Sequence, residues 1–188
     1  MKKLMMIAAM MLAAVTVSAQ EAGQTFLKPM VGGTLTNVTK ADGKMKFGLV
    51  AGAEFGYMCS EKFGITAGAL YTMQGAKGKN GIPDLKLEYI NVPVLANYYV
   101  APGFAIKAGV QPAFNVRHKI SYDGDSEDLD GIESFNLSIP VGISYEFSDF
   151  VIDARYNFGL SKIGKKEYTD TSNKNSVIML TLGYKIPF

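Results

Sequence analysis

The chain has 188 residues, of which 48% are hydrophobic, with 19 Lys and Arg against 17 Asp and Glu. This length predicts one domain with a substantial core. The near balance of charge argues against nucleic acid as a partner, because nucleic-acid binding calls for clustered positive charge. The single cysteine, Cys59, excludes an internal disulfide.

The first residues have the pattern of a secretory signal peptide. Lys2 and Lys3 precede the apolar run Leu4–Val17, and small residues follow at Val17–Ala19. This order predicts a signal peptide over 1–19 that is cleaved after Ala19. The apolar run is shorter than the roughly 20 residues that a transmembrane helix needs. Without Lys2 and Lys3, the remaining chain would carry 17 basic and 17 acidic residues.

Alternation of apolar and polar residues, rather than a helical period, dominates positions 20–188. Alternating segments of ten or more residues are typical of transmembrane β-barrels. Eight such segments occur: Thr25–Val38, Phe47–Cys59, Phe63–Ala76, Leu87–Val100, Phe104–His118, Ser134–Phe147, Phe150–Ile163 and Ser176–Phe188. We therefore predict that residues 20–188 form an all-β, eight-stranded antiparallel up-and-down transmembrane β-barrel.

The predicted connections alternate between short and long. The short ones are 60–62, 101–103 and 148–149, whereas the long polar ones are 39–46, 77–86, 119–133 and 164–175. Short periplasmic turns and longer extracellular loops are typical of outer-membrane barrels. With an even number of strands, this pattern predicts the bacterial outer membrane as the location, its lipid as a partner, and both termini on the periplasmic side.

The two faces of each predicted strand differ in size as well as polarity. In the seventh strand, large apolar residues such as Phe150 and Ile152 alternate with Asp153, Arg155 and smaller residues. Small residues suit the narrow interior of an eight-stranded barrel. Aromatic residues gather near strand ends, where interfacial girdles are expected: Phe47, Tyr57, Phe63, Tyr71, Tyr89, Tyr98, Tyr99, Phe104, Phe147 and Phe150. This arrangement favours a lipid-facing apolar surface.

Four segments carry a resemblance to a known family: "GALYTMQGAKG" (68–78), "LEYINVPVLANYY" (87–99), "DARYNFGLSKI" (153–163) and "LTLGYKIPF" (180–188). With them the chain resembles the eight-stranded outer-membrane barrels of Bacteroidota-type bacteria, called PorT-like or "outer membrane protein beta-barrel domain". The resemblance covers nearly all of the chain after Ala19 and implies a small barrel similar to OmpA and OmpX. The family is functionally heterogeneous, so the resemblance implies no single activity.

The segment 180–188 alternates strictly, which predicts a last strand that pairs with the first near Phe26–Leu35 and removes both sheet edges. The resemblance adds a second role, because outer-membrane barrels typically end on an aromatic residue that the barrel assembly machinery recognises. The residues that fit this C-terminal assembly signal are Leu180, Leu182, Tyr184, Ile186 and Phe188. Pro187 departs from the commonest form of the signal.

Charged residues on the inward parity predict a polar network inside the barrel. They are Lys28, Glu54, Lys107, Arg117, Glu146, Asp153, Arg155 and Lys185. Charges shielded from bulk water are expected to pair, and Asp153 with Arg155 is the first such pair expected, with Glu146 on the neighbouring strand. A lumen filled by these side chains is favoured, since eight strands leave just enough room for them. A narrow passive pore stays open as the alternative.

Two segments contain residue types that could support other chemistry. The acidic run 123–133 fails the spacing of an EF-hand loop, so it predicts a solvated segment, with weak cation bridging left open. His118, with Ser121 and Ser126 nearby, would be the centre of any lipid-modifying enzyme. A lone histidine near serines is weak support, so we predict no catalytic, metal or cofactor site. A structural or surface-interaction barrel with an unidentified partner is favoured over a pore or an enzyme.

Overall fold

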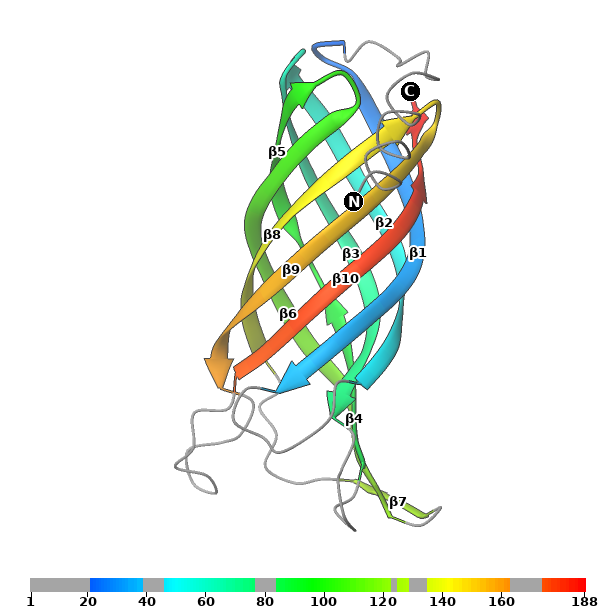
Figure 1. The fold of residues 1–188 in the computed structure, drawn as a ribbon, viewed down its shortest axis with the longest axis vertical. Coiled ribbons are helices and arrows are strands. Elements are labelled where there is room, and N and C mark those ends of the chain that lie inside the picture. The colour runs from blue at the N-terminus through cyan, green and yellow to red at the C-terminus, as the bar shows by residue number, and fades with distance from the viewer. Residues whose placement is uncertain (1–20, 39–45, 77–83, 123–124, 129–134, 163–173) are drawn as a thin grey trace, which may run out of the picture.

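The computed structural model describes residues 21–38, 46–76, 84–122, 125–128, 135–162 and 174–188. These residues form a closed antiparallel β-barrel (Figure 1). The described part contains no helix long and apolar enough to cross a membrane. The predicted signal peptide and the acidic residues 123–124 and 129–133 lie outside the described residues.

The strands follow one another around the wall in chain order. Their bounds are β1 Thr25–Val38, β2 Lys46–Ser60, β3 Phe63–Ala76, β4 Asp84–Asn91, β5 Val94–Ala101, β6 Phe104–Tyr122, β7 Asp125–Asp128, β8 Phe135–Phe147, β9 Phe150–Lys162, β10 Lys174–Tyr184 and β11 Ile186–Pro187.

These elements make the eight predicted passes through the wall. The fourth predicted strand is divided into β4 and β5, which both pair with β3 and β6. Pro93 causes the division because it has no backbone N–H for the ladder. Backbone hydrogen bonds still connect this point to both neighbouring strands: the N–H of Val92 donates to the carbonyl of Pro112, and the N–H of Gly68 donates to the carbonyl of Pro93.

The last pass closes the barrel on the first, as predicted. β1 pairs with β10 from Met30 opposite Gly183 to Val38 opposite Asn175. β11 continues the pairing, with Phe26 opposite Pro187 and Leu27 opposite Ile186. The closed eight-stranded barrel is therefore confirmed, and neither terminal strand presents a free edge.

The two ends of the barrel differ. The short turns β2–β3, β5–β6 and β8–β9 lie at the end that also carries the termini of the described chain, and the strand ends that lead into the long connections lie at the other end (Figure 1). We call these the turn end and the loop end. At the loop end β6 runs past the predicted limit of His118 to Tyr122 and pairs with β7. Part of the segment predicted as a loop, 125–128, is thus a strand.

The outer wall is apolar along its length. Large hydrophobic side chains on every pass are exposed, among them Val31, Leu49, Ile65, Val110, Ile143, Phe158 and Leu180. A soluble protein rarely exposes so continuous an apolar surface. Strands β8 and β9 have 13 residues each, more than the 9–11 tilted residues that cross a bilayer core. The wall therefore has the size and surface of a transmembrane barrel.

The lumen is built in layers of side chains. At the turn end Phe26, Met58, Tyr99 and Ala105 form one apolar cluster. A second apolar cluster lies further toward the loop end and contains Met30, Val50, Leu70 and Met179. Buried charged residues of the same strands, including Lys28 and Glu54, come between them in the alternation of β1 and β2.

Candidate functional site: the ion-paired lumen

Five buried charged side chains meet inside the barrel. Lys28 comes from β1, Glu54 from β2, Lys107 from β6, and Asp153 and Arg155 from β9. Each is at most 5% exposed. β2 and β9 are separated by β1 and β10 on the shorter path around the wall, so contacts between their side chains reach across the lumen. We call these five residues the central cluster.

Arg155 joins both carboxylates of the central cluster. Its Nε and Nη2 donate to the two oxygens of Asp153, at 2.6 Å and 2.9 Å, and its Nη1 donates to Oε1 of Glu54 at 2.5 Å. Such a bidentate pair fixes geometry as well as charge. Each carboxylate also has a lysine, because Lys28 Nζ lies 2.9 Å from Glu54 Oε2 and Lys107 Nζ donates to Asp153 Oδ2 at 2.5 Å.

Glycine provides the space that these long side chains occupy. Gly142 on β8 lies opposite Lys107 on one side and Arg155 on the other. A Cβ at this position would come within 3.0 Å of Arg155 Cγ and would also contact the carbonyl oxygen of Ala154. Gly68 stands in the same relation to Glu54, whose Cγ would lie 2.7 Å from an added Cβ. The central cluster therefore depends on the absence of a side chain at Gly142 and at Gly68 on the neighbouring strands.

Glu146 belongs to a second group nearer the turn end. Lys185 Nζ donates to Glu146 Oε2 at 2.9 Å, and the Tyr99 hydroxyl donates to Glu146 Oε1 at 2.6 Å. The Lys185 ammonium also lies 4.5 Å from the centre of the Phe26 ring, within cation–π distance. The structure therefore pairs Glu146 with Lys185 and Tyr99, whereas the sequence placed it with Asp153 and Arg155.

Arg117 was expected inside the barrel and lies outside it. Its side chain is 59% exposed and pairs with Glu88, which also accepts a hydrogen bond from the hydroxyl of the exposed Tyr71. The cause is a β-bulge: Glu88 is opposite Arg117 but Tyr89 is opposite Asn115, which leaves Val116 as an extra residue on β6. A bulge interrupts the alternation of faces, so the assignment of Arg117 to the lumen network is wrong.

Among the residues whose side chains the structure describes, the loop-side part of the lumen is polar but uncharged. A cavity of about 20 Å³ is lined by amide side chains, including Asn91, Gln111, Asn136 and Asn157. The amide nitrogens of Asn91 and Asn157 donate to Thr72 Oγ1 and to the carbonyl of Val177. This volume accommodates on the order of one water molecule. Between these amide side chains the lumen therefore leaves room for little more than one water molecule.

Two tyrosines expected in the aromatic girdle lie in the lumen instead. Tyr89 and Tyr99 are 1% and 7% exposed, whereas the neighbouring Tyr98 is 48% exposed. Parity could have assigned them, because Tyr99 shares its face with Asn97 and Tyr89 with Asn91. Because both tyrosines lie near strand ends, they were predicted as girdle residues. The hydrogen bond from Tyr99 to Glu146 was therefore not predicted either.

The residues of the predicted assembly signal lie along one outward face of β10 and β11. Leu180, Leu182, Tyr184, Ile186 and Phe188 are all exposed large hydrophobics. The last residue is held by its backbone: the N–H of Phe188 donates to the carbonyl of Thr25, and the Thr25 hydroxyl donates to the Phe188 oxygen at 2.7 Å. Its ring centre lies 5.9 Å from that of Phe55.

The candidate enzyme residues fall at the loop end. His118 and Ser121 lie on β6, opposite Leu87 and Asp84, and Ser126 on β7 lies opposite Ser121. Their side chains are outside the described part of the structure. Among the described residues, no group of three or more His, Cys, Asp or Glu side chains could hold a metal ion.

Comparison with known proteins agrees with this architecture. The model of the outer membrane protein beta-barrel domain matches residues 18–164. Ail, the attachment invasion locus protein of Yersinia pestis, is 20% identical with a TM-score of 0.54, over 88% of this chain and 99% of Ail. Neisserial surface protein A is 17% identical with a TM-score of 0.55, over 87% of this chain and 97% of that one. Likeness at these identities shows the fold alone.

A search of the curated proteins found no match. The family model, however, covers well over half of the sequence, and it agrees with the closed barrel and its apolar outer wall. The chain belongs to the outer membrane protein beta-barrel domain family.

Proposed function

We propose that this outer-membrane β-barrel protein is a closed barrel with a structural or surface-interaction role, rather than a conduit. The observation that carries the proposal is the central cluster, whose buried ion pairs cross the lumen between two apolar clusters. An ion passing through would have to separate charges that are almost fully buried, which is costly. The function then belongs to the ends of the barrel and to its outer surface.

Conductance of the purified barrel in planar lipid bilayers tests this proposal. We expect no stepwise conductance from the native protein, in membranes where a reference porin does conduct. Arg155→Ala removes the side chain that joins both carboxylates and is the variant most suited to reveal a pore. If it kept native stability and conducted, the filled lumen would be wrong and the narrow pore would be favoured.

We also propose that residues 1–19 are removed on export and that residues 20–188 form the barrel domain. The support is the pattern of Lys2, Lys3 and the apolar run before Ala19. Mass spectrometry of the protein from outer membranes is expected to find an N-terminus at Gln20. Protein that retains Lys2 and Lys3 would contradict this processing.

We propose that the surface-interaction role belongs to the loop end, where the strands lead into the long connections. We propose that both termini are periplasmic, which places this end at the cell surface. One solved structure of Ail contains the heparin analogue sucrose octasulfate, so this compound is a suitable first probe. Calorimetric titration into the folded barrel, compared with an uncharged sugar, tests whether this chain binds a sulfated ligand.

Three finer assignments complete the proposal. The assembly signal at Leu180–Phe188 would direct the chain to the barrel assembly machinery, and the PorT-like, Bacteroidota-type subgroup rests on the segments that resemble it. We further propose that the chain is not an enzyme. Lipid hydrolysis by the native barrel that disappears in His118→Ala would contradict this last assignment.

A further inference from the structure

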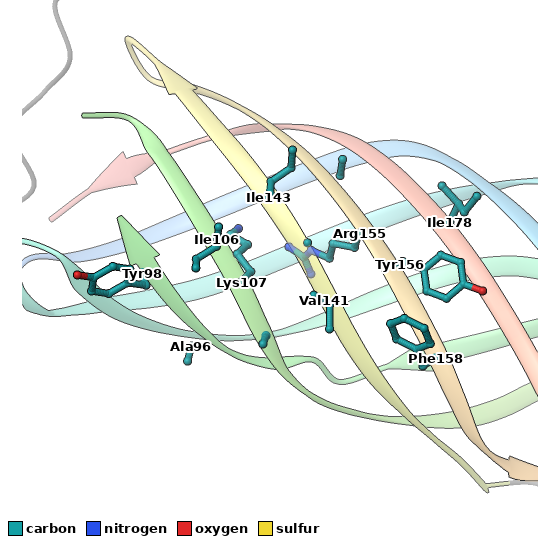
Figure 2. Close-up of a pocket in the computed structure, with 13 residues that line it drawn as sticks. Ala96, Tyr98, Ile106, Lys107, Val141, Ile143, Arg155, Tyr156, Phe158 and Ile178 are labelled. Atoms are coloured by element: carbon teal, nitrogen blue, oxygen red, sulfur yellow. The ribbon is translucent and has the colours of Figure 1, made fainter. Parts of the chain in front are cut away.

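The outer wall contains a broad hollow across β5, β6, β8, β9 and β10. It has a volume of about 820 Å³ and thirteen lining residues, with a largely apolar surface formed by residues such as Tyr98, Ile106, Ile143, Tyr156 and Phe158 (Figure 2). Lys107 and Arg155 also line it, but their charged groups are paired with Asp153 inside the barrel. We call this hollow the wall groove.

The wall groove exists because small residues meet across neighbouring strands. Ala96 on β5 lies opposite Ala108 on β6, and Ala108 lies opposite Val141 on β8. On the next strand the small residue is Ala154, opposite Ile143. Larger outward side chains, such as Ile106 and Tyr156, stand on either side of these positions. Neighbouring strands are about 4.8 Å apart, so the groove extends roughly 19 Å across the five strands.

The position of the groove on the barrel wall shows which surface it belongs to. Ala108 is four residues after the start of β6 and Ala154 is four residues after the start of β9, so these small residues lie in the turn-side half of the wall, and the groove continues from them to Phe158 and Ile178. Exposed apolar residues continue the surface on the same strands, including Val94, Val110 and Ile152. The groove is therefore continuous with the lipid-facing surface of the barrel, and hydrocarbon surrounds it.

We propose that the wall groove binds one acyl chain of a phospholipid from the leaflet on the turn side. The groove is elongated, apolar and open along the wall, which suits a flexible hydrocarbon chain. Tyr98 lies at its turn-side end, where an amphipathic ring is suited to the headgroup region. A second copy of the chain fits less well, since a standard protein interface uses about 20–30 residues a side and thirteen line the groove.

Electron paramagnetic resonance with an acyl-chain spin-labelled phospholipid tests the proposal. The variants Ala96→Phe and Ala108→Phe fill the groove, and each is expected to lose a motionally restricted lipid component that the native barrel shows. The control is Ala67→Phe: Ala67 is also an outward alanine four residues after the start of its strand, but it lies on β3 between Phe55 and Val94. It is expected to leave the restricted component unchanged.

A second measurement uses variants that do not fill the groove. The chain contains no Trp, so single Tyr→Trp reporters can be quenched by phospholipid brominated on its acyl chains. Tyr98→Trp reports on the groove and Tyr57→Trp is the control, because both tyrosines are outward, nearly equally exposed, and three residues from the end of their strands. We expect half-quenching at a lower bromolipid fraction for Tyr98→Trp.

Equal restricted lipid in the native barrel and both filled variants, or equal quenching of the two reporters, would overturn the proposal. Cross-linked dimers that disappear in Ala108→Phe would also overturn it and assign the groove to a second copy. The choice of leaflet rests on the proposed orientation of the barrel. A bound chain in a barrel inserted the other way would contradict that orientation and leave the groove assignment standing.

Discussion

Arg155 illustrates what a charge needs in order to be tolerated inside a narrow barrel. Three of its nitrogens donate to Asp153 and Glu54, and both carboxylates have a further lysine partner. Removing one member of a buried pair leaves an uncompensated charge, which costs about 3–5 kcal/mol. We therefore expect Arg155→Ala to lower the free energy of unfolding by that amount, as measured by urea titration of the barrel in lipid vesicles.

Arg117→Ala is the matched control for Arg155→Ala. Arg117 also pairs with a carboxylate, but its side chain is 59% exposed. Exposed pairs contribute roughly 0–1 kcal/mol, so this variant is expected to unfold close to the native midpoint. Equal losses in the two variants would mean that burial does not set the strength of the pairs in the central cluster.

Gly142 makes a second prediction about a single residue, this time through volume. A methyl group there would meet Arg155 and the carbonyl of Ala154, a backbone atom that cannot turn away. Overpacking of this kind costs typically 1–3 kcal/mol. Gly142→Ala is expected to unfold at a lower urea concentration than the native barrel, in the same vesicle assay. Unchanged stability would show that the wall shifts freely around the central cluster.

Alternation in the sequence was sufficient to place most of the lumen charges, because neighbours in a regular strand face opposite sides. It failed for Arg117, since the extra residue Val116 depends on pairing with β4 and leaves no local mark in β6. The partners of each charge were also hidden. Arg155 and Glu54 are 101 residues apart, and only the closure of the barrel brings their side chains together.

The sequence predicted which strands form better than it predicted where each strand begins and ends. The pass from Leu87 to Val100 was expected to be continuous, although Pro93 breaks the ladder between β4 and β5. Conversely, β6 continues to Tyr122 because β4 and β7 pair with its last residues on either side. The first limit is set by a residue of the strand itself, and the second by the neighbouring strands.

The last strand makes a prediction in which stability and assembly separate. Phe188 is 68% exposed, and it makes two hydrogen bonds with Thr25 and a ring contact with Phe55. Its loss should therefore cost the refolded barrel little free energy of unfolding. If it is part of the assembly signal, deletion of Phe188 is nevertheless expected to reduce the amount of protein in the outer membrane strongly, as measured by cell fractionation.

Phe47→Ala provides the comparison for the Phe188 deletion. Phe47 is 65% exposed, so truncation removes a similarly exposed aromatic ring from the start of β2 at the loop end. This variant is expected to reach the membrane at native levels. Normal levels of the Phe188 deletion, or an equal reduction in both variants, would contradict a special role of the last residue in assembly.

For the whole molecule, the distribution of residues between inside and outside explains what the sequence could reveal. Large apolar residues on one parity of every strand predicted a lipid-facing wall, and the structure exposes that parity. The partners of the barrel could not be predicted, because the proposed binding function would depend on the loop end, whose connecting sequences follow no period. The wall groove was equally hidden, since Ala96, Ala108 and Ala154 come from three separate strands.

The proposed orientation of the whole barrel makes the last prediction. Cys59 is the only cysteine and is exposed at the turn end of β2. If that end is periplasmic, a polymer-linked maleimide too large to pass a porin should leave Cys59 unmodified in intact cells and label it once the outer membrane is permeabilised. Cys59→Ser combined with Ser126→Cys moves the thiol to β7 at the opposite end of the barrel (Figure 1). That variant is expected to react in intact cells, because the loop end would face the medium. The reverse pattern would place the turns and both termini outside the cell. The leaflet on the turn side, which supplies lipid to the wall groove, would then be the outer one.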